Sequence, residues 1–374
     1  MITNKKAYIN SFEAVSCAGL DSQELFASIC EKKDCITIDK SYVKDREVAI
    51  GKIYSKLSFS ELLTKTVNKV LINSNLENYN DTLLVVGSSV GGMNETEKVF
   101  FRDSNYKNID YKKHPIDAIA YHLKKDFDFY DDISFSTACT SSANAISYAK
   151  EVISKGIYKN VLVVGVDALS YTTVCGFSAL SVLSSKPCTP FEKNREGMNV
   201  AEAIAVLLIQ NQKSQENSIE ICGVGYSSDG HHMTQPHPEG LGAAKAMENA
   251  ISDGKIEKEK ISYINAHGTG TMANDSSELN AISLVFGNCK PYVSSTKSFT
   301  GHTLGAAGAI EAIISSLALQ KQIIPPSKNI KELEREDILF SNEPINKEIS
   351  YVLSNSFAFG GNNTSILLGL DNDN

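Results

Sequence analysis

The chain has 374 residues, of which 42% are hydrophobic and 21% are charged, and its net charge is −8. This composition is typical of a globular protein. The acidic balance argues against nucleic acid and anionic membrane surfaces as partners. No apolar run approaches the roughly 20 residues that span a bilayer, and no apolar signal core follows the charged start. We therefore expect a cytoplasmic protein without membrane insertion.

The eight cysteines are scattered along the chain and show neither a CxxC pair nor the spacing of a zinc site. They are Cys17, Cys30, Cys35, Cys139, Cys175, Cys188, Cys222 and Cys289. Free thiols in a reducing compartment are the simplest interpretation.

A faint repeat indicates two similar α/β halves. Residues 82–92 form an apolar run that ends in a Gly-rich loop, and residues 261–271 show the same pattern. A polar stretch at 211–217 favours a boundary between a half at 1–212, which carries the candidate nucleophile, and a half at 213–374, which carries two candidate histidines. Repeated βα units also arise by coincidence in α/β proteins.

Cys139 is the most informative residue of the first half. β-Prone residues precede it, and Ala143, Ile146 and Ala149 follow with helical spacing, which predicts a strand-to-helix turn. A thiol at the start of a helix meets unpaired N–H groups and the positive end of the dipole, which favour the thiolate. The alternative is a buried free cysteine that packs the turn.

Two histidines in the second half lie in Gly-rich turns. His267 lies directly after a predicted strand, within the run 261–271, and His302 follows Gly301. Either one alone could be structural, but a cysteine with a histidine is a nucleophile and base, and a second histidine adds a hydrogen-bond donor toward an oxyanion. A third Gly-rich turn at 354–363 offers backbone N–H groups for an oxyanion hole, or else is a simple hairpin loop.

Together, the segments around Cys139, His267, Lys297 with His302, and Phe359 resemble the β-ketoacyl synthases of the elongating Cys-His-His class. The resemblance implies a thiolase-like five-layer α/β/α/β/α fold made of two similar halves. It also implies decarboxylative Claisen condensation of a malonyl group on an acyl carrier protein with an acyl group on Cys139. The pathway would be fatty-acid elongation or a specialised polyketide or polyene route.

The same resemblance assigns catalytic roles. Cys139 would accept the acyl group, with its own N–H and that of Phe359 as the oxyanion hole. His267 and His302 would bind the malonyl thioester carbonyl and stabilise the enolate. Lys297 would support the histidines electrostatically. Glu278 matches the carboxylate partner of that lysine.

Further positions match the substrate-binding part of the family pattern. Thr269 and Thr271 would hydrogen-bond the phosphopantetheine arm, and Asp275 lies beside them. Phe359 would gate the acyl pocket. Met198 stands where the family has phenylalanine, which predicts a pocket of different shape, and Ala358 stands where it has glycine, which predicts a stiffer gate.

No cofactor is required by the implied reaction. The resemblance points to a structural monovalent cation, which oxygen ligands would suit. The matching positions are Asn265, Glu311, Ser354 and Asn355. The alternative is that these polar groups bond one another.

The resemblance also implies partners: an acyl carrier protein, and either a second copy or a related ketosynthase-like subunit in a dimer. One rival interpretation is a non-catalytic subunit of the chain-length-factor kind, but such subunits lack the nucleophile. The other is a thiolase or a chain-initiating synthase. Thiolases use a second cysteine near the C-terminus, and initiating enzymes carry Asn at the position of His302.

Overall fold

The computed structural model describes residues 5–44, 46–74, 76–214 and 218–371. Its strands are β1 (Tyr8–Ser16), β2 (Thr37–Asp39), β3 (Val48–Gly51), β4 (Thr82–Gly87), β5 (Asp132–Phe135), β6 (Asn160–Asp167), β7 (Val200–Ala201), β8 (Ala203–Gln210), β9 (Ile219–Ser228), β10 (Ile261–Asn265), β11 (Tyr292–Ser294), β12 (Ile323–Ile324), β13 (Leu339–Phe340), β14 (Ile345–Asn346), β15 (Tyr351–Phe357) and β16 (Asn362–Leu370).

The α-helices are α1 (Ser22–Cys30), α2 (Phe59–Ile72), α3 (Met93–Asp103), α4 (Asp117–Phe127), α5 (Ser141–Ser154), α6 (Tyr171–Ala179), α7 (Leu241–Gly254), α8 (Met272–Phe286), α9 (Lys297–Thr300) and α10 (Ala307–Lys321). Short 3₁₀ turns are η1 (Tyr111–Lys113), η2 (Lys258–Lys260) and η3 (Leu304–Ala306). Among the described residues, no helix combines the length and the apolar character that a bilayer span requires. The cytoplasmic location stays a prediction.

The main sheet repeats one strand pattern twice. Its order is β13-β11-β10-β15-β16-β9-β1-β8-β6-β4-β5. In the first half β8 is antiparallel to β6, and β6, β4 and β5 run parallel. In the second half β16 is antiparallel to β15, and β15, β10 and β11 run parallel. In the described part of the sheet, the two halves pair through β1 and β9, at Tyr8 and Ile9 of β1.

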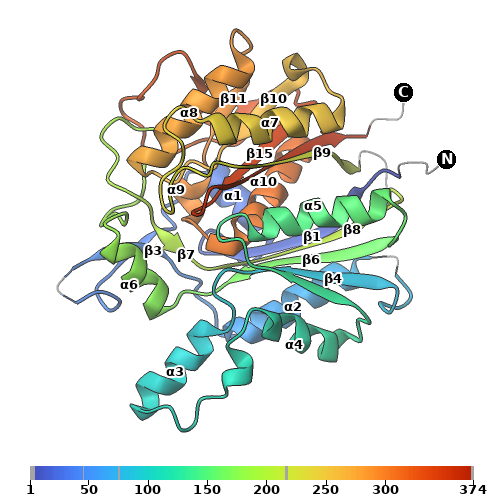
Figure 1. Cartoon of the computed structure of the whole chain (residues 1–374), viewed down its shortest axis with the longest axis vertical. Helices are drawn as coiled ribbons and strands as arrows, with labels where there is room; N and C mark the ends of the chain where they lie inside the picture. The colour runs from blue at the N-terminus through green and yellow to red at the C-terminus, as the bar shows by residue number, and fades with distance from the viewer. Residues whose placement is uncertain (1–4, 45, 75, 215–217, 372–374) are drawn as a thin grey trace.

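Helices cover both halves of the sheet and separate them (Figure 1). Helices α2 and α4 pack on the outer face of the first half, and α7 packs with α8 on the outer face of the second. Helices α5 and α10 lie between the halves and contact strands of both. The result is five alternating layers of helix and strand. The predicted boundary after residue 212 stays a prediction, and residues 215–217 beside it fall outside the described part of the chain.

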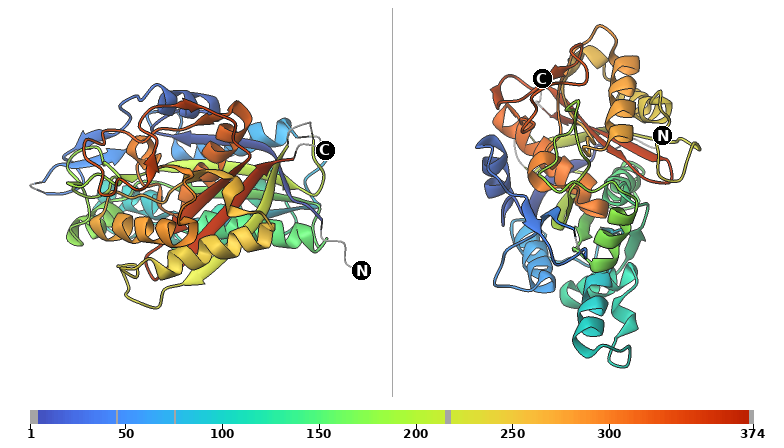
Figure 2. Two further views of the ribbon diagram at one scale, coloured as in Figure 1. Left: turned by 90° about the horizontal axis from the view of Figure 1, so that it is seen from above. Right: turned by 90° about the vertical axis from the view of Figure 1, so that its left-hand side faces the viewer.

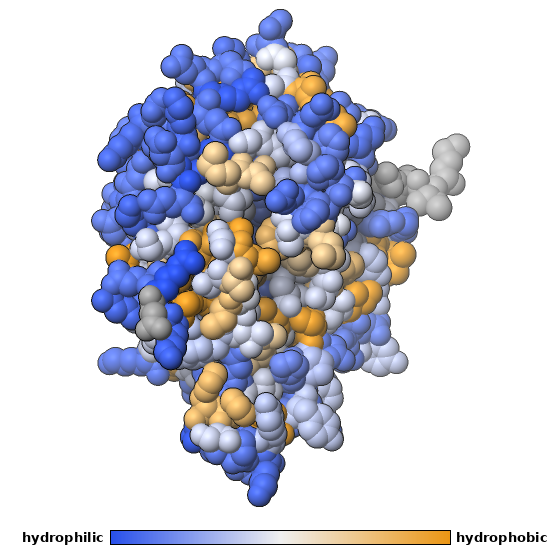
Figure 3. Space-filling view, turned by 60° about the vertical axis from the view of Figure 1, so that its left-hand side comes forward, coloured by the Kyte–Doolittle hydropathy of each residue, from blue (hydrophilic) through white to orange (hydrophobic). Residues whose placement is uncertain are grey.

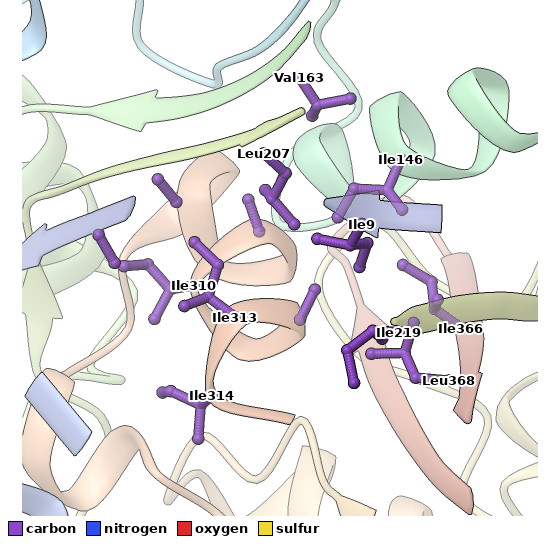
Figure 4. Packing of buried hydrophobic residues seen from close by; sticks show 14 of the residues in the cluster. Ile9, Ile146, Val163, Leu207, Ile219, Ile310, Ile313, Ile314, Ile366 and Leu368 are labelled. Atoms are coloured by element: carbon purple, nitrogen blue, oxygen red, sulfur yellow. The ribbon is translucent and has the colours of Figure 1, made fainter. Parts of the chain in front are cut away.

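The central layer explains the small residues at the starts of α5 and α10. Gly308 of α10 lies so close to α5 that an added Cβ would be 2.6 Å from the Cβ of Ala143. Farther along, α10 carries Ile310, Ile313 and Ile314 into a core shared with both half-sheets (Figure 4). This close packing fixes the two helix starts relative to each other.

The candidate residues follow the carboxyl ends of parallel strands. Strands β5, β10 and β11 end just before the segments with Cys139, His267 and Lys297, respectively. Helix α3 and the turn after it project from the opposite end of the body to α7 and α8 (Figure 2). On the face in Figure 3, hydrophobic side chains form a band across the middle and a smaller group at the end where α3 lies.

Candidate active site

Cys139 occupies the predicted turn between β5 and α5. The preceding residue, Ala138, adopts a left-handed φ of 53°, which turns the chain sharply before the helix. The cysteine is 7% exposed and lines a cavity of about 300 Å³. The predicted strand, turn and helix are therefore confirmed.

The expected shift of the thiol pKa is wrong in direction. Burial raises the pKa of Cys139 to about 12. The positive charge of Lys297 and the backbone N–H groups of Phe359 and Cys139 act in the opposite sense but do not outweigh burial. The resting sulfur is thus a protonated thiol, and its activation needs a proton acceptor.

His302 supplies that acceptor. Its Nε2 lies 3.0 Å from the Sγ of Cys139. Burial, with Lys297 as the second cause, holds the pKa of His302 well below its ordinary value, so the ring is neutral. Its Nδ1 is buried and has no hydrogen-bond partner among the described residues. No partner at Nδ1 fixes the tautomer, so Nε2 is free either to accept the thiol proton or to donate one.

His267 faces the same cavity from the turn between β10 and α8. Its ring centroid lies 5.2 Å from that of His302, with the two planes at 87°. Lys297 Nζ lies 3.3 Å from His267 Nδ1. Burial and the charge of Lys297 keep the pKa of His267 well below its ordinary value. A lysine can only donate, so Nδ1 accepts and the proton of the neutral ring is on Nε2.

The carboxylate partner predicted for Lys297 is wrong. Lys297 Nζ forms a buried ion pair with Glu311, which lies one helical turn into α10. Burial raises the pKa of Glu311 to about 7, and the lysine charge opposes this. The pairing follows from α9 and α10 being neighbours across the His302 loop, which no local spacing reveals.

Glu278 instead holds the backbone beneath His267. Its two carboxylate oxygens accept from the N–H groups of His267, at 2.8 Å, and Gly268, at 2.7 Å. Asn355 Nδ2 donates to the same carboxylate at 3.2 Å. Burial raises the pKa of Glu278 to about 7, and these hydrogen bonds oppose the shift.

The predicted substrate-binding residues separate into two groups. Thr269, Thr271, Met198 and Phe359 line the cavity with the cysteine and both histidines. The hydroxyls of Thr269 and Thr271 lie 2.9 Å apart. The prediction that Asp275 belongs to the substrate-binding residues is wrong, because Asp275 is fully buried and does not line the cavity. Its carboxylate lies beside Arg195 and accepts from backbone N–H groups of the surrounding loops.

The gate loop shows no backbone strain at Ala358, which is not among the residues with positive φ. Phe359 contacts Phe177 of α6, with ring centroids 5.9 Å apart. Phe177 is a site residue that the sequence did not indicate, although its aromatic ring also lines the cavity. An aromatic side chain on a short helix gives no local signal of which cavity it faces.

The four candidate cation ligands differ in whether their side-chain oxygens already accept hydrogen bonds. Asn265 Oδ1 and Glu311 Oε2 are buried and have no hydrogen-bond partner among the described residues. Asn355 is already used, because its Oδ1 accepts from Ser365 and its Nδ2 contacts Glu278. Ser354 is buried on β15. In the described part of the chain, no three His, Cys, Asp or Glu side chains gather as a metal-binding set. The two unpartnered oxygens fit a hard cation, whereas Asn355 fits the alternative of mutual bonding.

Comparisons with known proteins agree on one family. The profile described as "Beta-ketoacyl synthase, N-terminal domain" matches residues 58–215, and that described as "Beta-ketoacyl synthase, C-terminal domain" matches residues 219–331. A 3-oxoacyl-[acyl-carrier-protein] synthase 2 from Coxiella burnetii is 35% identical over 314 residues, which cover 76% of this chain and 74% of the relative.

The same-named protein from Staphylococcus aureus is 36% identical over 247 residues, so the match spans 62% of this chain and 61% of that relative. A solved ketosynthase from Xenorhabdus doucetiae, in complex with its chain length factor, has 29% identity and a TM-score of 0.88, covering 98% of both chains. A β-ketoacyl synthase from Burkholderia phymatum has 26% identity and a TM-score of 0.87, covering 98% of this chain and 99% of the other. The predicted five-layer thiolase-like fold is confirmed.

Proposed function

The chain belongs to the β-ketoacyl synthase family, and on that premise we propose that it catalyses decarboxylative Claisen condensation on carrier-protein thioesters. One observation carries the proposal. The Cys139 sulfur and the rings of His267 and His302 converge on one cavity, although they come from three distant segments. This set supplies a nucleophile, a proton acceptor and two donors toward developing negative charge.

In the first half-reaction the Cys139 thiol gives its proton to His302 Nε2, 3.0 Å away, and attacks the acyl thioester. The N–H groups of Cys139 and Phe359 support both the thiolate and the oxyanion of the tetrahedral intermediate. The C–S bond to the carrier then breaks, and the carrier leaves as a thiol with the proton from His302. The products are acyl-Cys139 and free carrier thiol.

In the second half-reaction a malonyl thioester takes the place of the departed carrier. The Nε2–H of His267 donates to its carbonyl oxygen. His302 donates beside it after its proton has moved from Nδ1 to Nε2, a change of tautomer that the unpartnered Nδ1 leaves open. Carbon dioxide leaves, and the electron pair of the broken C–C bond becomes an enolate that these donors stabilise. The enolate carbon attacks the acyl carbon and the bond to Sγ breaks, which leaves the Cys139 thiolate. That thiolate takes one proton from the solvent, the proton consumed overall when the malonyl carboxylate leaves as carbon dioxide. The product is a 3-oxoacyl thioester.

No cofactor takes part in these steps. We propose that a monovalent cation binds at Asn265 Oδ1 and Glu311 Oε2, the two unpartnered oxygens behind the catalytic lysine. Such an ion would coordinate the two buried oxygens, which otherwise lack a partner among the described residues. A higher thermal midpoint in potassium or sodium chloride than in choline chloride of equal concentration would support it. Equal midpoints in all three salts would exclude it.

The proposed partners are an acyl carrier protein and a second ketosynthase-like chain. The Xenorhabdus relative was solved with its chain length factor. In this chain β5 is an edge strand of the main sheet, and its residues are half-buried. An open edge favours pairing with another strand. Sedimentation of the chain alone and with candidate partner subunits separates the homodimer from the heterodimer.

The experiment that tests the function is intact-mass analysis after exposure to acyl carrier protein. The wild-type chain should gain one acyl group and, with malonyl carrier protein, release carbon dioxide and a 3-oxoacyl product. Cys139→Ala should gain no acyl group. Cys188→Ala is the matched control, because Cys188 is also buried and its pKa is also raised to about 12 by burial, but it lies outside the cavity lining.

Two outcomes would contradict the proposal. Acylation of Cys139→Ala at the wild-type rate would exclude Cys139 as the nucleophile. A folded wild-type chain that binds carrier protein but releases no carbon dioxide would favour the non-catalytic, chain-length-factor-like alternative.

A further inference from the structure

Asp167 is a buried carboxylate that the proposed mechanism does not use. It is the last residue of β6 and is 1% exposed. It lies at the carboxyl end of a parallel strand, the edge where the catalytic turns also begin. Among the described residues no lysine, arginine or histidine forms an ion pair with it, and the family resemblance assigns it no role. Its bonding partners show what it does.

One oxygen of Asp167 holds the turn after β4. Oδ1 accepts from the Ser88 hydroxyl at 2.6 Å and from the backbone N–H groups of Ser89, at 3.0 Å, and Val90, at 3.1 Å. Ser89 in turn donates its hydroxyl to the carbonyl oxygen of Ala138 at 2.8 Å. Because Ala138 immediately precedes the nucleophile, Asp167 is two hydrogen bonds away from the Cys139 turn.

The other oxygen holds the loop after His302. Oδ2 accepts from the backbone N–H of Gly305 at 2.6 Å and shares the N–H of Ser89, also at 3.0 Å, with Oδ1. The approach is close, since a Cβ on Gly305 would lie 2.6 Å from the Ser89 nitrogen and 2.8 Å from Asp167 Oδ2. The glycine therefore permits the His302 loop, the β4 turn and the carboxylate to meet at one point.

Every partner of Asp167 is a donor, and only an ionised carboxylate accepts from all of them. Burial raises the pKa of Asp167 to about 6, and the hydrogen bonds oppose the shift. The group is thus mainly ionised at neutral pH. Its negative charge also raises the pKa of Cys139, so its electrostatic effect on the thiol is unfavourable to the thiolate.

We propose that Asp167 is a positioning residue that sets the distance between the Cys139 sulfur and the His302 ring by tying their two loops to one carboxylate. The geometric and the electrostatic effects of the residue have opposite signs. Removing the charge alone would favour the thiolate, whereas loosening the loops would slow every step that needs His302 at Cys139. Because the two effects of Asp167 act in opposite directions, measurements on variants can tell which of them dominates.

The kinetic arm of the test rests on the proposed function. In Asp167→Asn the amide nitrogen would face an N–H donor, so one loop loses its anchor. We expect kcat for condensation to fall about 10- to 100-fold, because small displacements of reacting groups slow a reaction by such factors. The KM for malonyl carrier protein should stay within about twofold, because the threonines that would hold the carrier arm are not bonded to Asp167. Ser89→Ala, which removes only the link to Ala138, should show a smaller fall in kcat.

The matched control is Glu13→Gln. Glu13 is likewise a buried carboxylate that accepts from two backbone N–H groups, of Ala14 and Ser22, but it lies outside the cavity lining. The Glu13→Gln substitution should lower the thermal midpoint and leave kcat unchanged. A wild-type kcat in both Asp167→Asn and Ser89→Ala would overturn the proposal. If Asp167→Asn does not fold, Ser89→Ala alone decides.

A second arm does not depend on condensation activity. The rate of Cys139 alkylation by iodoacetamide is measured for wild type, Asp167→Asn, His302→Ala and the double variant. If Asp167 acts by placing His302 against the sulfur, the effect of His302→Ala should shrink in the Asp167→Asn background. Additive effects would overturn the proposal. A wild-type chain that shows no condensation would refute the proposed function, and the alkylation cycle would still test Asp167.

Discussion

Lys297 Nζ contacts both His267 Nδ1, at 3.3 Å, and the carboxylate of Glu311. The first contact leaves the proton of His267 on Nε2, which faces the cavity. The second contact balances the positive charge of the buried lysine, because a buried charge is costly without an oppositely charged partner. The Lys297 side chain thereby links the tautomer of His267 to the stability of the fold.

Replacing Lys297 should separate these two roles. Lys297→Met leaves Glu311 buried without its partner, so the free energy of unfolding in urea should fall by about 3–5 kcal/mol. Decarboxylation of malonyl carrier protein should also be lost, because nothing then fixes the His267 tautomer. The double variant Lys297→Met with Glu311→Gln should recover much of the stability but none of the decarboxylation. Recovery of activity together with stability would show that the lysine is only structural.

Glu278 should make stability depend on pH. Its folded pKa of about 7 lies above the ordinary value of 4.5, so the folded state binds the proton more tightly than the unfolded state. Its contribution is complete below pH 4.5 and is lost as the pH rises toward and through 7. The wild type should therefore lose more stability than Glu278→Gln between about pH 5 and about pH 8 in urea titrations. Parallel pH dependences in the two proteins would contradict the raised pKa.

Helix α3 should influence the acyl pocket through Glu97. This carboxylate accepts from the N–H groups of Tyr171, at 2.7 Å, and Thr172, at 2.8 Å, at the start of α6. Helix α6 carries Phe177 against the gate residue Phe359. We expect Glu97→Ala to lower the thermal midpoint and to broaden the preference among acyl chain lengths, measured by competitive acylation of Cys139.

The control for that prediction is Glu61→Ala. Glu61 closes a capping box with Ser58 at the start of α2, away from the cavity lining. The Glu61→Ala substitution should lower the thermal midpoint without changing the chain-length preference. A broadened preference in the control variant, or an unchanged one in Glu97→Ala, would show that α6 does not shape the pocket in this way.

The contact between α5 and α10 should tolerate no added atom. A Cβ at position 308 would lie 2.6 Å from the Ala143 Cβ and 2.7 Å from its backbone nitrogen. Gly308→Ala should therefore destabilise the chain by about 1–3 kcal/mol, as overpacked cores do, when unfolding in urea is followed by circular dichroism. Gly176→Ala in α6 should be neutral or stabilising by up to about 1 kcal/mol, because the new Cβ would have no described atom within 4 Å apart from its chain neighbours and its own helix backbone. Equal effects at both positions would contradict the packing argument.

The amino-acid sequence by itself determined the local features of this protein. Apolar strands followed by Gly-rich turns, and small residues at the starts of two helices, depend on neighbours within a few positions. The strand-to-helix turn at Cys139 is therefore readable from the sequence, as is the position of His267 after β10. The family pattern extended this to the four segments that meet at the cavity.

Tertiary structure alone decided how the charged groups are paired and protonated. Lys297 bonds Glu311 rather than Glu278, Asp275 lies outside the cavity lining, and burial raises the Cys139 pKa instead of lowering it. Asp167 gave no signal in the sequence because its partners lie 77 to 138 residues away. Pairing and desolvation depend on distances through space between remote segments, and periodicity and local spacing carry no record of those distances.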